Sequence, residues 1–87
     1  MLELGDFVYN TLKKEYGEVV ALTDGNMYGV MYDTYNESRH DLDYESRKNF
    51  SKYTFSSKAP FCKDGHGWYE FKDDLIKVSE NKQYLLF

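Results

Sequence analysis

The stretch that decides the fold runs from residue 16 to residue 33 and reads YGEVVALTDGNMYGVMYD. Its two halves are apolar and contain several Val and Tyr residues, which favour strands. Between them stands Asp24-Gly25, and an Asp-Gly pair flanked by apolar runs predicts a tight turn, because Gly accepts a positive φ at no steric cost. We therefore expect a β-hairpin with strands over 16–22 and 27–33.

The second strand of this hairpin is apolar on both sides. Alternate side chains of a strand point to opposite faces, which places Tyr28, Val30 and Tyr32 on one face and Met27, Gly29 and Met31 on the other. A strand with one face in water would alternate between apolar and polar residues instead. The pattern is typical of a strand in a tightly closed sheet.

Shorter stretches on either side of the hairpin have the composition or the alternation of strands. They cover residues 7–9, 52–56, 68–71 and 75–78, and Tyr53 and Phe55 share one face of the second of them. The intervening segments are predicted to be a loop over 10–15, a connector over 57–67 and a tight turn over 72–74. Residues 34–46 are polar, with room for a short helical turn at 36–39. The apolar tail over 83–87 is interpreted as a last strand or a plug.

Length and composition exclude several classes of protein. The chain has 87 residues, enough for one domain, and its 41% hydrophobic and 18% aromatic residues argue against intrinsic disorder. No run approaches the roughly 18 apolar residues of a membrane span, and no signal peptide is indicated. A single cysteine, Cys62, excludes an internal disulfide framework. These features predict a single domain over 1–87 in the cytoplasm, without membrane contact.

The net charge of −4 conceals a strong segregation of charge along the chain. Residues 1–45 contain ten acids and three bases, a balance of −7, and residues 64–87 contain five acids and three bases, a balance of −2. Residues 46–63 contain five bases and no acid, a balance of +5. Such segregation bears more on the choice of partner than the total does.

Short motifs recur in a fixed order along the chain: Gly5-Asp6-Phe7-Val8, then Gly17-Glu18-Val19-Val20, the hairpin strand, the aromatic strand at Trp68 and Asp74-Leu75 before the closing strand. This order resembles that of Src-homology-3-like small barrels of the KOW and Tudor type. The resemblance implies an all-β fold, a barrel of about five or six short bent strands. The barrel core would comprise residues 4–33 and 67–79. Residues 34–66 would be a long decorated insertion.

The basic segment over 47–63 is the first candidate site. Cations alternate there with rings, a mixture that suits phosphate groups and stacked bases. Its candidate residues are Arg47, Lys48, Phe50, Lys52, Tyr53, Lys58 and Lys63. Two plainer interpretations stay open. The segment can be a half-buried strand with its lysines in water, or it can neutralise the neighbouring acidic stretch within one molecule.

That acidic stretch carries Asp41, Asp43 and Glu45 and is the second candidate site. Carboxylates spaced among aromatic residues can imitate a phosphate backbone, as in small inhibitors carried by phages. A solvated loop explains the same residues.

Aromatic rings supply a third possibility, because Tudor-type barrels capture methylated side chains in aromatic cages through cation–π attraction. The rings available are Tyr9, Tyr28, Tyr32, Tyr35, Trp68 and Tyr69, with Asp33 nearby. No spacing singles out a cage, and burial in the core explains these rings as well.

Metal binding and catalysis receive little support from the sequence. Cys62 and His66 lie four residues apart and His40 adjoins Asp41, but paired ligand spacings are absent. No Gly-rich phosphate loop precedes a helix. We therefore expect no enzyme activity, no metal and no cofactor.

Taken together, the sequence predicts a non-catalytic binding protein. The expected partner is a host protein or protein complex that a phage or mobile-element accessory protein inhibits or modulates, for example in host defence. The alternative is a nucleic-acid or nucleotide-binding module that uses residues 47–63.

Overall fold

The structure is a computed structural model that describes residues 2–23, 25–34, 42, 44–61 and 66–79. The described strands are β1 (Phe7–Asn10), β2 (Glu15–Leu22), β3 (Met27–Tyr32), β4 (Thr54–Phe55), β5 (Gly67–Phe71) and β6 (Leu75–Val78). The described helices are one four-residue α-helix, α1 (Tyr44–Arg47), and two 3-10 turns, η1 (Ala59–Phe61) and η2 (Lys72–Asp74). The prediction of an all-β fold is confirmed.

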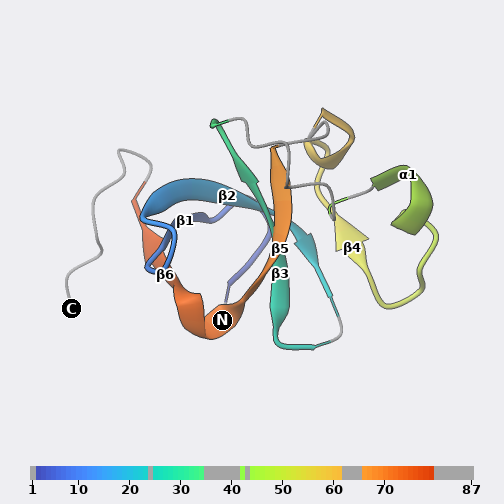
Figure 1. Cartoon of the computed structure of the whole chain (residues 1–87). Coiled ribbons are helices and arrows are strands. Elements are labelled where there is room, and N and C mark those ends of the chain that lie inside the picture. Colours follow the sequence, from blue (N-terminus) through green and yellow to red (C-terminus); the bar gives the residue numbers. More distant parts are fainter. Residues whose placement is uncertain (1, 24, 35–41, 43, 62–65, 80–87) are drawn as a thin grey trace.

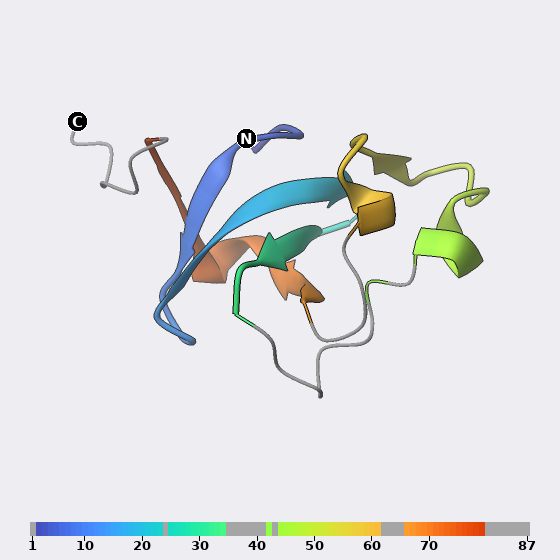
Figure 2. The same ribbon diagram turned by 90° about the horizontal axis from the view of Figure 1, so that it is seen from above.

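All six strands belong to one antiparallel sheet (Figure 1). Its order is β5-β3-β2-β1-β6, and β4 pairs with β2 beside this path. Two views at right angles place α1, η1 and β4 together at one end of the molecule and β6 at the other (Figures 1 and 2). The segment over 44–61 therefore extends the sheet at one end only.

The predicted hairpin is confirmed, since β2 and β3 pair from Gly17↔Tyr32 to Leu22↔Tyr28. A bulge interrupts this register at Val20, between Val19 and Ala21. An extra residue in one strand shifts the phase of the side chains. As a result, Val20 and Ala21 both face one side of the sheet although they are neighbours in the sequence.

Two clusters of buried side chains lie on the two faces of the sheet. The first, called here the strand core, comprises Val8, Val19, Val30 and Tyr32, with Leu2, Leu4, Leu22, Tyr28, Trp68 and Leu75 packed around them. The second, called here the insertion core, comprises Val20, Ala21, Leu42, Ala59 and Tyr69, with Met27, Met31, Tyr44, Tyr53 and Phe55 packed around them. The prediction that both faces of β3 are apolar is thus confirmed.

Two glycines let the strands approach these cores closely. A Cβ atom on Gly17 would lie 2.5 Å from a methyl carbon of Val30 and 2.8 Å from the backbone oxygen of Met31. A Cβ atom on Gly29 would lie 2.6 Å from the Cβ atom of Ala21. Neither position has room for a side chain.

The structure departs from the expected elements in the second half of the chain. The strand expected over 52–56 is confined to Thr54–Phe55, and the helix α1 was not anticipated. The connector expected over 57–67 contains η1, and its last residue already belongs to β5. The helical turn considered at 36–39 and the apolar tail over 83–87 lie outside the described residues. Within the described residues, no helix has the length and apolar character needed to cross a membrane.

Candidate functional site

A cleft of about 360 Å³ lies beside the tip of the β2–β3 hairpin. It is lined by Thr23, Gly25, Asn26, Met27, Arg47, Tyr53 and Tyr69. Two of these residues, Arg47 and Tyr53, belong to the basic segment that the sequence singled out. A second hollow, of about 420 Å³, lies beside Leu2 and η2 and is lined by none of the predicted site residues.

The sheet positions the floor of the cleft. In the β3–β5 pairing, Met27 lies opposite Phe71 and Gly29 lies opposite Tyr69. The side chains of Tyr69 and Phe71 share one face of β5, because alternate residues of a strand point the same way. Since Gly29 has no side chain, a carbon of the Tyr69 ring can lie 3.3 Å from where a Cβ atom would be.

The segment over 44–61 supplies the opposite wall. The guanidinium carbon of Arg47 lies 4.8 Å from the centre of the Tyr69 ring, a cation–π distance. The Tyr53 ring meets the Tyr69 ring edge to face, with centroids 6.0 Å apart. Tyr44 closes on Phe55 in the same manner at 5.2 Å, which holds α1 against β4.

Arg47 is half-buried, and no carboxylate pairs with it in the described part of the chain. Its guanidinium carbon lies over the Tyr69 ring. The guanidinium group carries five N–H donors in a fixed fork, which suits an anion that accepts two hydrogen bonds side by side, such as a carboxylate or a phosphate.

Exposed rings continue the surface beyond the cleft. Phe50 is 51% exposed and packs edge to face on Tyr53 at 5.3 Å, while Phe71 is 58% exposed. We call Phe50, Tyr53, Tyr69 and Phe71 the aromatic face.

Two other cations of the basic segment are paired with carboxylates. Lys48 donates a hydrogen bond to Glu45 at 2.8 Å, and this bond, together with the charge of the carboxylate, raises the pKa of Lys48. Lys58 donates to the nearly buried Glu18 of β2 at 2.9 Å. Lys52 is exposed in the turn before β4, and Lys63, Asp41 and Asp43 lie outside the described residues.

Among the described residues, the interpretation of the basic segment as a neutraliser of the acidic stretch applies to one pair, Lys48 with Glu45. The partner of Lys58 comes from β2, in a part of the chain that the sequence did not connect with it. The structure brings Arg47 and Tyr53 together at the cleft and directs Lys48 and Lys58 away from it.

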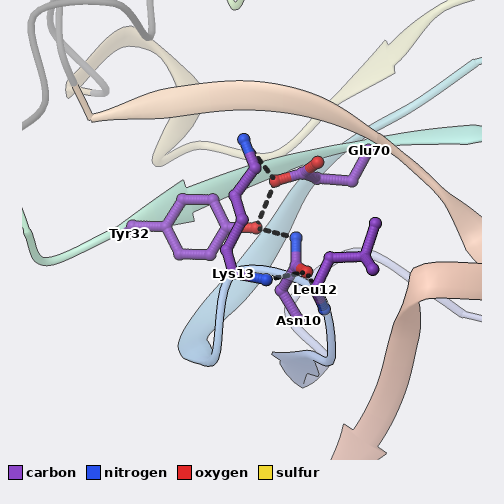
Figure 3. A network of polar contacts seen from close by, with 5 residues as sticks. All are labelled: Asn10, Leu12, Lys13, Tyr32 and Glu70. Carbon is purple, nitrogen blue, oxygen red and sulfur yellow. Dashed lines mark hydrogen bonds and ion pairs between the residues drawn. The ribbon is translucent and has the colours of Figure 1, made fainter.

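A buried polar network lies in the strand core, and the sequence analysis missed it (Figure 3). The Asn10 amide donates to the Tyr32 hydroxyl at 3.1 Å, and this hydroxyl donates to the Glu70 carboxylate at 2.6 Å. The Lys13 ammonium lies 3.9 Å from the same carboxylate and 4.1 Å from the centre of the Trp68 ring. The sequence contains one indication of this network. Glu70 follows Trp68 by two residues on a strand, so its carboxylate lies on the same face as a ring of the core.

The network connects the β1–β2 turn to the sheet. The Asn10 side-chain oxygen accepts the backbone N–H groups of Leu12 and Lys13, both at 2.9 Å. Lys14, the last residue of this turn, has a positive φ of 58°. Because the polar groups of the network satisfy one another in a buried place, we assign it a role in stability rather than in chemistry.

The rings considered for a cage are distributed over both cores. Tyr28, Tyr32 and Trp68 belong to the strand core, Tyr69 belongs to the insertion core, and Tyr9 packs on Tyr16 at 4.8 Å. Tyr35 lies outside the described residues.

No group of three potential metal ligands occurs among the described residues, which do not include Cys62 or His40. The Nδ1 atom of His66 lies 3.2 Å from the backbone oxygen of Tyr32.

No protein-family model, no curated protein and no solved structure matches this chain. Its function is therefore argued from its own residues.

Proposed function

We propose that this chain is a non-catalytic protein-binding domain whose contact surface is the cleft together with the aromatic face. The observation that carries the proposal is the cleft at the hairpin tip, where Arg47, Tyr53 and Tyr69 converge beside exposed rings. Segments that are far apart in the sequence form this surface. The surface therefore exists only in the folded chain.

The composition of this surface supports protein binding. Arg, Tyr, Phe and Met are enriched at the centres of protein interfaces, and truncating a few buried rings or arginines removes most of the binding energy. Tyr53 and Tyr69 are packed against neighbours, so little conformational entropy is lost when they are covered. Met27 adds a side chain that adapts to the shape of a partner.

We further propose that the sheet is a Src-homology-3-like barrel. The support is the pairing of β1 with β6, which brings the beginning and the end of the described chain side by side. A single 3-10 turn, η2, joins β5 to β6. The cleft then lies between this barrel and the segment over 44–61. One further statement stays a prediction from the sequence: the partner is a host protein, and this chain is a phage-encoded protein that modulates it.

Photo-crosslinking from defined positions tests the proposal. p-Benzoylphenylalanine is introduced in place of Phe50 or Phe71, and in place of Leu12 as a matched control. Leu12 is 72% exposed but lies in the turn at the opposite end of β2 from the cleft. We expect one partner, identified by mass spectrometry, to be crosslinked from both aromatic positions and not from Leu12.

The identified partner is then purified and titrated. The double variant Phe50→Ala, Phe71→Ala should weaken its binding by about tenfold or more, since truncated interface rings typically cost at least about 1–2 kcal/mol. Leu12→Ala should leave binding unchanged. Equal crosslinking from all three positions, or an unchanged affinity of the double variant, would refute the proposal.

Nucleic-acid binding is the second candidate, favoured by the placement of the Arg47 guanidinium on the Tyr69 ring beside Tyr53. Lys48 and Lys58 are already paired with carboxylates, so not all five cations of the segment can bind phosphate groups. Binding of oligo-dT should then show a slope of log K against log salt shallower than about −3.5, the value for five contacts at ~0.7 per phosphate. Absence of binding at low salt excludes this candidate.

A further inference from the structure

We infer that the cleft recognises an acidic side chain, Asp or Glu, that adjoins an aromatic or aliphatic side chain in an exposed segment of the partner protein. This inference rests on the proposed protein-binding function and names the chemistry that the cleft would select. The inference is based on one positively charged side chain, Arg47, at the edge of the cleft.

The cation is Arg47. Its guanidinium carbon lies over the Tyr69 ring, 4.8 Å from the ring centre, and no carboxylate pairs with it among the described residues. This cation–π contact restrains the guanidinium group before a ligand arrives. A carboxylate can therefore accept two parallel hydrogen bonds, the geometry for which arginine is better suited than lysine.

The remaining polar groups at the hairpin tip are partly occupied. The Thr23 hydroxyl donates to the Met27 backbone oxygen at 2.8 Å and accepts the Gly25 backbone N–H at 3.3 Å. The Asn26 backbone oxygen accepts the N–H group of Lys72 at 2.7 Å. Among the described residues that line the cleft, Arg47 alone has a charged side chain.

The apolar part of the ligand is specified by the floor of the cleft. Met27 and Tyr69 form it, Tyr53 adds a ring from the opposite wall, and a volume of about 360 Å³ accommodates one or two side chains. This volume is near the lower end of ligand pockets, which typically span roughly 300–1,000 Å³. Met27 can adjust to either an aromatic or an aliphatic side chain.

The charge distribution favours a peptide over a nucleic acid. A nucleic acid gains affinity from several phosphate contacts at once. Here the neighbouring Lys48 and Lys58 are held by Glu45 and Glu18, and Arg47 is the one cation among the described residues that line the cleft. One charge-assisted contact beside an apolar hollow matches a side chain better than it matches a phosphate backbone.

Selection from a library of random 12-residue peptides displayed on phage tests the inference with the chain as it exists. We expect selected peptides to carry Asp or Glu next to an aromatic or aliphatic residue. One of them, synthesised with a fluorophore, is titrated by anisotropy. Arg47→Gln in the protein, or replacement of the acidic residue by its amide in the peptide, should each weaken binding about tenfold to hundredfold.

A double-mutant cycle combines Arg47→Gln in the protein with the amide in the peptide and shows whether the two side chains contact each other. If they do, the losses of binding free energy caused by the two changes should not add. Lys48→Gln is the matched control: it removes the adjacent cation, which pairs with Glu45 and does not line the cleft. It should change the affinity less than about twofold. Arg47→Lys should recover only part of the binding, since the ammonium group does not form the paired hydrogen bonds.

The outcomes separate the inference from the proposed function. Neutral peptides whose binding depends on Phe50 and Tyr53 but not on Arg47 would overturn the inference and preserve the protein-binding function. Selected peptides that bind variants of the aromatic face as tightly as the unaltered chain would overturn both. Binding of oligo-dT that Arg47→Gln abolishes, with no peptide selected, would overturn both in favour of a nucleic acid.

Discussion

Removing one hydroxyl group, by the substitution Tyr32→Phe, tests the buried network of Asn10, Tyr32 and Glu70. The hydroxyl donates to the Glu70 carboxylate at 2.6 Å and accepts from the Asn10 amide at 3.1 Å. Asn10 and Glu70 are only 1% and 5% exposed, so water cannot readily replace the lost partner. The Asn10 side chain cannot turn over either, because its oxygen is held by two backbone N–H groups.

The expected cost follows from these two bonds. A hydrogen bond to a charged group contributes about 1.5–3 kcal/mol, and an unsatisfied buried donor adds about 1 kcal/mol. Tyr32→Phe should therefore lower the free energy of unfolding by about 3 kcal/mol. For a chain of this size, 1 kcal/mol corresponds to roughly 4–8 °C, so that Tm should fall by roughly 10–25 °C.

Urea and thermal unfolding, followed by circular dichroism, measure both quantities. Tyr16→Phe is the matched control: the Tyr16 ring packs on Tyr9, and no hydrogen bond of its hydroxyl occurs among the described residues. That variant should stay within about 0.5 kcal/mol of the unaltered chain. A Tyr32→Phe variant that is equally stable would show that the network contributes nothing, and the reasoning from burial would be refuted.

Two further predictions concern a close approach of strands and a surface ion pair. Gly17→Ala should destabilise the chain by about 1–3 kcal/mol, because the new Cβ atom would lie 2.8 Å from the Met31 backbone oxygen; Gly25→Ala, which meets nothing within 4 Å, serves as the control in the same urea titration. The hydrogen bond to Glu45 raises the pKa of Lys48 above 10.5, so this pair stabilises the fold below pH 10.5 and the contribution is lost as the pH rises through the raised pKa. Glu45→Gln should lower the pKa of Lys48 towards 10.5 in an NMR titration, and an unchanged value would contradict the assignment.

The sequence predicted the strands that a local residue pattern specifies, whether their partners are near, as in the hairpin, or distant, as for β5 and β6. The hairpin over 16–33 follows from an Asp-Gly turn between apolar runs, and β5 and β6 follow from short apolar stretches around a polar turn. The strand expected over 52–56 is shorter for a reason that lies elsewhere in the chain. Its partner β2 ends at Leu22, opposite Thr54, so the residues before Thr54 have no backbone to pair with.

Features that depend on tertiary contacts could not be predicted in the same way. A four-residue helix such as α1 is too short to form by itself and is held by the packing of Tyr44 on Phe55 and of Arg47 on Tyr69. Arg47 and Tyr53 were expected at a binding site because of their residue types. Their meeting with Met27 at the hairpin tip depends on the folded arrangement.

The bulge at Val20 allows one strand to belong to two cores. Val19 and Leu22 face the strand core, whereas Val20 and Ala21 face the insertion core. Within the described residues, the segment over 42–59 contributes to the insertion core alone, while the Asn10–Tyr32–Glu70 network lies on the other side of the sheet. During evolution, this segment could therefore change its sequence to follow a changing partner while the opposite core kept the fold.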